Sequence, residues 1–387
     1  MPVKNRFAEL HAEITEWRRD LHEHPEILFD THRTAGIVAD KLRAFGCDEV
    51  VTSIGRTGVV GVIKGKANGS GKVIGLRADM DALPILEATG LDYASKTPGA
   101  MHACGHDGHT AMLLGAAKYL SETRNFDGTC VVIFQPAEEG GAGGKEMCDD
   151  DMMDRFGIQE VYGMHNWPGM PTGSFAIRSG PFFAATDQFD VTITGRGGHA
   201  AMPNLTVDPT VVTAHLVLAL QSIVSRNADP VEQIVVSVTS FTTASTAFNV
   251  IPQTVQIKGT IRTMTPASRA MAEERFKTIC TGTCAAYGAT ADVTWIKGYP
   301  AMVNAPDQTD FAAEVAASVA GTCDTAEITM GGEDFAYMLE ERPGAYILVG
   351  NGDTAKVHSP DYNFNDDAIP AGCSWWAEIA ERRMPAS

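Results

Sequence analysis

The stretch TAMLLGAAKYLSE, residues 110–122, is followed after a short connection by TCVVIFQPAEE, residues 129–139. The first segment has the apolar spacing of a buried helix, and the second has the continuous apolar run of a strand covered on both faces. Similar buried runs recur as KVIGLRAD at 72–79, EVYGMH at 160–165 and AYILVG at 345–350. Strands of this kind alternating with helices predict an α/β fold with a mostly parallel sheet flanked by helices.

Two further helices are expected near the amino terminus. The apolar residues of the first recur at spacings of three and four, at Phe7, Leu10, Ile14, Trp17 and Leu21. The second is predicted from about Thr34 to Phe45 and ends at Gly46, a residue type that commonly terminates helices.

A different pattern begins near Thr186. The segment TDQFDVTITG, residues 186–195, alternates like a strand with one exposed face. The chain up to residue 298 then reads as helix, strand, strand, helix and strand, which completes the βαββαβ order of a ferredoxin-like domain. Because the first pattern resumes after this segment, we expect one domain made of residues 1–184 and 300–387 and an inserted domain of residues 185–299.

Composition narrows the class of protein. The chain has 387 residues, of which 44% are apolar and 20% charged, as in globular proteins large enough for two domains. Its formal charge of −18 opposes binding to nucleic acids or to anionic membrane surfaces. Eight scattered cysteines without a CxxC pair, and a first segment without a signal-peptide core, predict reduced thiols and a cytoplasmic location.

Metal-type donors follow the buried strands of the first pattern. In an open α/β sheet, ligands bind just outside the carboxyl ends of the strands, so these donors are expected to share one crevice. The donors are Asp79 and Asp81, Glu138 and Glu139, His165, and His358.

The nonapeptide MHACGHDGH, residues 101–109, adds further donors. Cys104 and His106 are two residues apart in a glycine-containing turn, which allows both side chains to face one ion. The alternative is that the histidines cap the following helix or bond one another. The thiol, the carboxylates and the other histidines favour a metal, and this mixture of donors suits zinc or a similar divalent transition metal.

The acidic pair in QPAEEGGAGG, residues 135–144, can serve two roles. Where the strand ends and the chain turns, one glutamate can bind metal while the other faces the substrate. The alternative is an exposed acidic pair, although a five-residue buried run precedes it. A phosphate-binding loop is excluded, because Glu139 and Glu146 occupy positions that require Gly and Ser or Thr.

Three polar residues of the inserted domain remain ambiguous on their own pattern. His199 lies in GRGGHAAMP, residues 195–203, and a turn residue and a functional residue are equally compatible with this segment. Asn249 in FNVIP is a turn residue or a substrate ligand, and Arg262 in GTIRT is a solvent-facing strand residue or a substrate ligand.

Taken together, these segments resemble the amidohydrolase branch of the aminoacylase and carboxypeptidase metallopeptidases, in the zinc-peptidase-like superfamily. This branch includes hippurate hydrolases, N-acyl-amino-acid deacylases and plant hydrolases of indoleacetyl amino acid conjugates. The resemblance extends from near residue 20 to near residue 372. The segments that carry it are HEHPEILFDTHRTA, RADMDALPI, SKTPGAMHACGHDGHTAMLLGAA, FQPAEEGGAGG, GMHNWPGMPTG, GRGGHAAMPNLTVDP, FNVIP, GGEDFAYM and HSPDYNFND.

The resemblance implies a role for each candidate residue. Two divalent metal ions would be held by five ligands, namely Cys104, His106, Glu139, His165 and His358. Glu138 would act as general base and His199 would polarise the scissile carbonyl. Where the wider family has His-x-Asp, this chain has Asp79 and Asp81, which we expect to support the ligands. Asn249 and Arg262 would bind the substrate.

The activity implied is hydrolysis of the amide bond of N-acyl amino acids, with N-acetyl and N-benzoyl conjugates as examples. Zn or Mn is the expected metal, with Co or Ni as further candidates. The inserted domain would act as a lid and as the contact of a homodimer or higher homo-oligomer. The alternatives are a carboxypeptidase or dipeptidase acting on small peptides and a non-catalytic metal- or ligand-binding protein.

Overall fold

The computed structural model describes residues 5–386, which form two compact units. Unit 1 comprises the chain up to Gly180, the segment Val303–Glu327 and the chain from Asp334 onward. Unit 2 comprises Pro181–Met302 and Ile328–Glu333. The expected boundaries at 184 and 300 differ from these limits by a few residues, and the assignment of Ile328–Glu333 to unit 2 had no signal in the sequence.

Unit 1 contains an eight-stranded sheet in the order β1-β2-β4-β3-β5-β16-β6-β15. The central strands β4, β3, β5 and β16 run parallel, whereas β1, β2 and β6 pair antiparallel with their inner neighbours. The predicted mostly parallel sheet is therefore confirmed at its centre. The strands are β1 Glu49–Ile54, β2 Gly58–Lys64, β3 Val73–Asp79, β4 Thr129–Gln135, β5 Glu160–Trp167, β6 Phe175–Ile177, β15 Asp324–Thr325 and β16 Gly344–Gly350.

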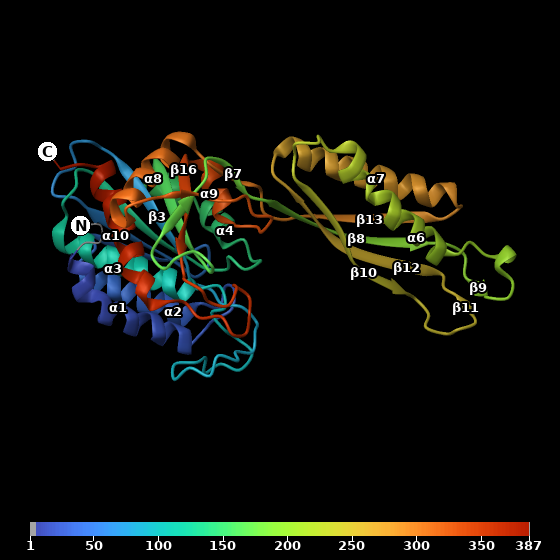
Figure 1. Ribbon diagram of the computed structural model, residues 1–387, viewed down its shortest axis with the longest axis horizontal. Helices are drawn as coiled ribbons and strands as arrows, with labels where there is room; N and C mark the ends of the chain where they lie inside the picture. Colours follow the sequence, from blue (N-terminus) through green and yellow to red (C-terminus); the bar gives the residue numbers. More distant parts are fainter. Residues whose placement is uncertain (1–4, 387) are drawn as a thin grey trace. The chain divides into compact units, whose positions relative to one another are not determined.

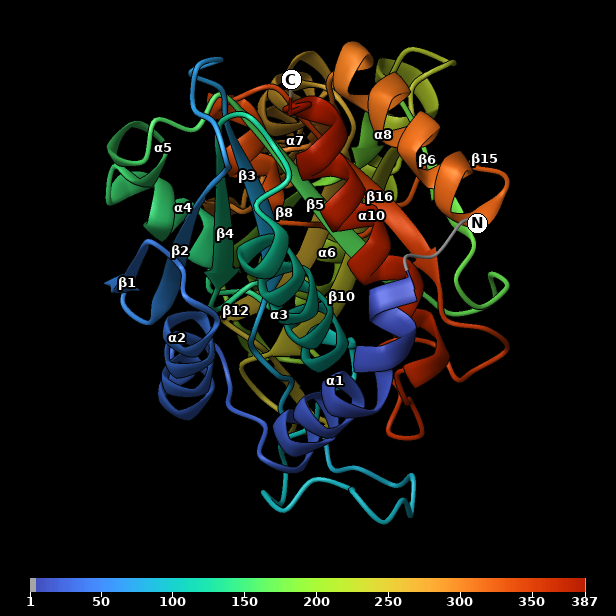
Figure 2. The same ribbon diagram turned by 90° about the vertical axis from the view of Figure 1, so that its left-hand side faces the viewer.

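Helices cover both faces of this sheet (Figures 1 and 2). One layer contains α1, α2, α3, α8 and α10, while α4 and α9 pack together on the other side of the sheet (Figure 1). Every residue of β16 is buried, as expected for a strand covered on both faces. The helices are α1 Asn5–Glu23, α2 His32–Phe45, α3 His106–Thr123, α4 Gly143–Asp149, α5 Met152–Arg155, α8 Pro306–Ala320, α9 Phe335–Glu341 and α10 Ile369–Arg383, with a short helical turn η3 at Asp366–Ala368.

The predicted second helix is confirmed, including its end. Gly46 adopts the left-handed conformation, with φ at 82°, and its N–H donates a hydrogen bond to the carbonyl of Arg43. A residue with a Cβ would be strained at this φ, so glycine ends the helix at low cost.

Unit 2 has the predicted βαββαβ order and a four-stranded antiparallel sheet, β10-β12-β8-β13. Along β8 the inner-facing residues are buried and the others partly exposed, which matches the alternation in the sequence. The elements are β8 Ala185–Thr194, β9 Gly198–His199, η1 Pro203–Leu205, α6 Pro209–Leu220, η2 Ile223–Asn227, β10 Ile234–Thr243, β11 Val250–Ile251, β12 Thr254–Thr263, α7 Pro266–Ala286 and β13 Thr290–Lys297. Two short strands, β7 Gly180–Phe183 and β14 Met302–Asn304, pair with each other where the chain passes between the two units.

No helix within the described residues combines the length and the apolar character that crossing a lipid bilayer requires.

Candidate metal centre

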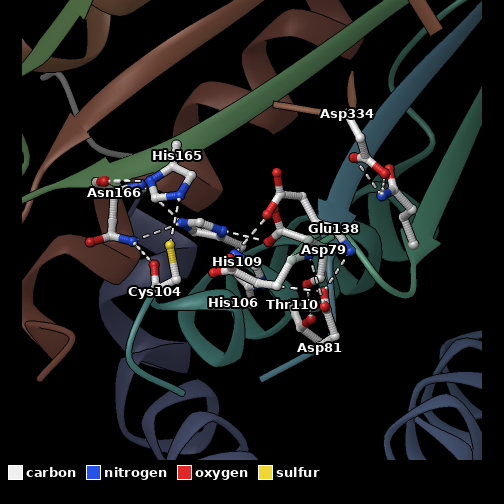
Figure 3. A network of polar contacts seen from close by, with 12 residues as sticks. Asp79, Asp81, Cys104, His106, His109, Thr110, Glu138, His165, Asn166 and Asp334 are labelled. Carbon is white, nitrogen blue, oxygen red and sulfur yellow. Dashed lines mark hydrogen bonds and ion pairs between the residues drawn. The ribbon is translucent and has the colours of Figure 1, made fainter. Parts of the chain in front are cut away.

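Separate segments of unit 1 bring the predicted metal donors together, and Figure 3 shows Cys104, His106 and His165 among them. Asp79 is the last residue of β3, and Glu138 and Glu139 follow the end of β4. His165 lies on β5, while His358 lies on the chain after β16. Because the central strands are parallel, their carboxyl ends meet at one edge of the sheet, as expected for the site of an open α/β sheet.

The two donors of the MHACGHDGH segment, Cys104 and His106, lie at the start of α3, close to this edge of the sheet. His106 is the first residue of the helix, and Cys104 lies two residues before it. The intervening Gly105 has a φ of 86°, which favours glycine. The sulfur of Cys104 lies 3.3 Å from Nε2 of His165.

The donor atoms form overlapping clusters of a size that suits metal ions. In each cluster all donor atoms lie within 4.8 Å of one another, and neighbouring clusters share a residue. The clusters built from predicted ligands and the predicted base are Cys104 with His106 and His165, Cys104 with Glu139 and His358, and His106 with Glu138 and Glu139.

Hydrogen bonding separates the two histidines of α3 into different roles. Nε2 of His106 has no hydrogen-bond partner within residues 5–386, although the side chain is fully buried. Both nitrogens of His109 are occupied, Nδ1 by a carboxylate oxygen of Asp79 at 2.6 Å and Nε2 by the backbone N–H of Asn166 at 2.9 Å. A buried nitrogen without a partner is costly unless it binds something, so His106 fits a ligand and His109 a support.

Helix capping does not explain these histidines. The capping position before α3 is occupied by Gly105, and no side-chain hydrogen bond caps the helix there. His102 is fully buried with neither ring nitrogen hydrogen-bonded within the described chain, and burial lowers its pKa to about 3. The capping alternative is therefore wrong for this segment.

The electrostatics of the site favour a cation. Burial raises the pKa of the Cys104 thiol well above its usual value, and Glu139, Glu138 and Asp79 raise it further. Burial disfavours the charged form of His106, but the surrounding carboxylates outweigh this effect and raise its pKa to about 10. A divalent cation among these groups would reverse both effects, because it stabilises a thiolate and repels a proton on the imidazole.

His165 is set up as a neutral ligand. Burial, together with the neighbouring His109, holds the pKa of His165 well below its usual value. Its Nδ1 lies 2.6 Å from the backbone carbonyl oxygen of Asn166, which fixes the proton on that nitrogen and leaves Nε2 free to face Cys104. Such a carbonyl partner is the usual orienting contact of a metal-binding histidine.

Asp81 ties the glutamate pair to the site. Its two carboxylate oxygens accept the backbone N–H groups of Glu138 at 2.9 Å and Glu139 at 3.1 Å. Oδ1 of Asp81 also lies 3.4 Å from Nδ1 of His106, on the side of the ring away from Nε2. One buried carboxylate therefore orients the glutamate-bearing turn and one imidazole.

Asp79 is held by a buried arginine that sequence reasoning missed. The guanidinium of Arg77 donates to Asp79 at 2.8 Å and to Asp334 at 2.9 Å, and all three side chains are inaccessible. Burial opposes ionisation of Asp79, yet His106, His109 and Arg77 hold its pKa well below the ordinary value. Asp79 is thus a carboxylate that orients His109. No spacing in the sequence indicated that Arg77 would bind Asp79.

The residues present fit a pair of divalent ions. They offer a thiol, three imidazoles and a glutamate, a mixture that suits zinc and related transition metals. Glu138 adds a carboxylate beyond the predicted ligands, and its side chain is buried in the same cluster.

The three candidate residues of the inserted domain belong to unit 2, whereas the predicted metal donors belong to unit 1. His199 and Asn249 are exposed and adjacent, because His199 pairs with Val250 between β9 and β11. Arg262 is half-buried on β12, and its guanidinium donates to Oγ1 of Thr260 at 2.6 Å. Of these three residues, the structure therefore places His199 and Asn249 next to each other.

Arg262 and His199 occupy opposite ends of the unit 2 sheet. Arg262 pairs with Thr186 near the start of β8, whereas His199 follows Thr194 at its end. The strand between Thr186 and Thr194 spans about 26 Å at roughly 3.3 Å per residue. One small substrate molecule therefore cannot touch both residues of the same unit.

Comparison with known proteins supports the same class of protein as the metal donors described above. Residues 75–382 match peptidase family M20/M25/M40. The chain belongs to this family. It is 42% identical over 377 residues to a hippurate hydrolase of Campylobacter jejuni, covering 97% of each chain. It is also 38% identical to an N-acetylcysteine deacetylase of Bacillus subtilis, with 96% of each chain covered.

Solved structures of the M20/M25/M40 family share the fold. A dinuclear metal-binding peptidase of Bacillus subtilis is 34% identical, with a TM-score of 0.86 over 97% of this chain and 99% of the other. The agreement over nearly the whole of both chains includes both units, so the central sheet and the inserted βαββαβ segment belong to the shared fold.

Proposed function

We propose that this member of the M20/M25/M40 family is a dinuclear metal-dependent hydrolase that cleaves the amide bond of N-acyl amino acids. The observation that carries the proposal is Glu138, a buried carboxylate clustered with the donors His106 and Glu139. A purely structural metal site closes its coordination with protein donors and needs no further carboxylate beside it. The names of the two relatives support an acyl amino acid as substrate.

Five residues would hold the two ions, namely Cys104, His106, Glu139, His165 and His358. Divalent ions bound there would polarise the amide carbonyl and lower the pKa of water toward neutrality. Zn and Mn fit this mixture of thiol, imidazole and carboxylate best, and Co and Ni are further candidates.

The catalytic protein groups are Glu138 and His199. Glu138 takes the proton of the attacking water and returns it to the nitrogen of the departing amine, so one carboxylate acts first as base and then as acid. His199 donates a hydrogen bond to the oxygen on which negative charge develops. Asp81 keeps Glu138 in place through the backbone N–H contact at 2.9 Å.

A panel of substrates tests this proposal. We expect hydrolysis of N-acetyl, N-benzoyl or indoleacetyl amino acids, with activity lost on chelation and restored by Zn²⁺ or Mn²⁺ while circular dichroism shows a folded chain. The measurement is release of free amino acid. Faster cleavage of dipeptides would indicate a peptidase instead, and unfolding on chelation without activity on any member would indicate a structural metal site.

The proposed functional form is a homodimer joined through unit 2. Helix α6 is apolar on both sides, since Val212 and Leu216 are buried while Leu218 is 71% exposed. Strand β10, the neighbouring edge of the sheet, carries no charged residue over Ile234–Thr243 and exposes Phe241. An uncharged edge strand of ten residues invites pairing with a second copy, because its unpaired backbone groups are available.

We propose that His199 completes the site of the partner subunit. The backbone of a substrate with two residues spans at most about 7 Å. The interval between Arg262 and His199 within unit 2 is much longer, so the two residues of one chain would serve different substrate molecules. In a dimer, each site can combine Arg262 of one chain with His199 of the other.

Mixing two inactive variants tests this arrangement. His199→Ala alone should lower kcat by about 10²–10³, the usual effect of removing a donor to a developing oxyanion. When His199→Ala and Glu138→Gln chains are dissociated and reassociated together, we expect about one quarter of the parental activity, because half of the dimers carry one intact site. Light scattering checks that the mixture is dimeric.

A mixture no more active than the sum of its components would mean that His199 serves its own chain. A monomeric parent protein with full activity would contradict the dimer itself.

A further inference from the structure

Asn166, the residue after His165 on β5, contacts three of the segments that carry the candidate ligands. Its side chain is fully buried. Its Nδ2 donates a hydrogen bond to the carbonyl of Cys104 at 2.6 Å, and its Oδ1 accepts one from the hydroxyl of Tyr362 at 2.7 Å. These contacts join the strand β5 to the turn before α3, whose Cys104 is labelled in Figure 3, and to the loop that follows His358.

The backbone of Asn166 adds a second set of contacts. Its N–H donates to Nε2 of His109 at 2.9 Å, while Nδ1 of His165 lies 2.6 Å from its carbonyl oxygen. Since Nδ1 of His109 is bound to the carboxylate of Asp79, Nε2 of His109 must act as the acceptor. The direction of every hydrogen bond around Asn166 is therefore determined.

The side chains of Asn166 and Tyr362 pack so closely against Gly105 that no other residue type fits at position 105 without a shift. A Cβ on Gly105 would lie 2.3 Å from Nδ2 of Asn166 and 2.5 Å from the hydroxyl of Tyr362. The loop of His358 is tied to the same turn, because the N–H of His358 donates to the carbonyl of Ala103 at 2.7 Å. The turn carrying Cys104 is thus fixed from both sides.

We propose that Asn166 is a positioning residue that sets the affinity of the site for its metal ions. It acts through the spacing of Cys104, His165 and His358, without being a ligand. The inference rests on the proposed metal-dependent function, and it concerns the binding of metal rather than the chemistry of the substrate. Buried groups that orient ligands in this way typically change metal affinity by about 10–100-fold when they are altered.

Asn166→Asp is the sharpest test. The substitution keeps the shape but places a carboxylate oxygen against the carbonyl of Cys104 and Nε2 of His109, where Nδ2 now lies at 2.6 Å and 3.1 Å. Two facing acceptors repel each other, so we expect zinc affinity to fall about 10–100-fold. The measurement is transfer of Zn²⁺ from the loaded full-length protein to a competing chelator, followed by elemental analysis.

Asn304→Asp provides the matched control. Asn304 is also buried in unit 1, and its Nδ2 donates to two carbonyl oxygens, those of Arg178 at 2.8 Å and Tyr346 at 2.9 Å. The same acceptor repulsion should lower the melting temperature of both variants, whereas only Asn166→Asp should lose zinc.

Tyr362→Phe gives a milder second variant in case Asn166→Asp does not fold. It removes only the hydroxyl that donates to Oδ1 of Asn166, so we expect a smaller loss of zinc affinity in a folded chain. Unchanged affinity in both Asn166→Asp and Tyr362→Phe, or an equal loss in Asn304→Asp, would overturn the proposal. Because the measurement is metal binding, a protein that binds Zn²⁺ but cleaves no N-acyl amino acid would refute the proposed function and leave this inference standing.

Discussion

Glu138→Gln is expected to reduce kcat by about 10²–10⁴ while the metal content stays that of the parent protein. The amide keeps the size of the side chain but cannot accept a proton from water or return one to the leaving amine. The loss corresponds to ~3–5 kcal/mol of transition-state stabilisation. Steady-state kinetics on the best substrate of the panel and elemental analysis of the same sample check the result.

Glu139→Gln is the matched comparison, because it alters the adjacent carboxylate. Glu139 lies in a cluster with Cys104 and His358, so its loss should appear first as metal release. Added metal should therefore rescue Glu139→Gln in part and Glu138→Gln not at all. Near-parental turnover in metal-loaded Glu138→Gln would remove this residue from the mechanism.

Cys104→Ser is expected to weaken metal binding by more than about 100-fold, beyond the effect of altering a supporting residue. A hydroxyl is harder than a thiol and remains protonated, whereas the cation would hold the thiol as a thiolate. The sulfur belongs to two of the donor clusters, so both ions should be affected. Competition with a chelator measures the affinity, and activity should return only at high metal concentration.

Cys373→Ser controls for the loss of a buried thiol. Cys373 is equally buried on α10, and its thiol donates to the backbone carbonyl of Met112 at 3.1 Å, a bond that a serine hydroxyl can also make. We expect this variant to bind metal as the parent does. Equal metal affinity in Cys104→Ser and the parent would show that the thiol is not a ligand.

The secondary structure was largely readable from the sequence because burial patterns are local. Apolar runs such as AYILVG predicted fully covered strands, and β16 is buried at every position. After Thr186 the apolar residues no longer form continuous runs but alternate with polar ones. This change predicted the ferredoxin-like order that unit 2 shows. Strand ends carrying donors also predicted the convergence at one edge of the sheet, since parallel strands place their carboxyl ends together.

The role of each residue within the site could not be predicted from the sequence in the same way. His106 and His109 are three residues apart in one motif, yet one has a free nitrogen and the other is saturated by Asp79 and Asn166. The role of Arg77 could not be predicted either. The partners of a charged residue inside a buried strand lie on distant segments, so they are known only once these segments pack together.

The sequence by itself determined the α/β class, the inserted βαββαβ segment and the set of donors, because each depends on the residue types along a short stretch. The tertiary structure decided which donors remain free for metal, that Asn166 links three ligand-bearing segments, and that Arg262 and His199 lie at opposite ends of one sheet. Hydrogen-bond partners and sheet register are set by groups far apart in the chain, and these become neighbours only through packing.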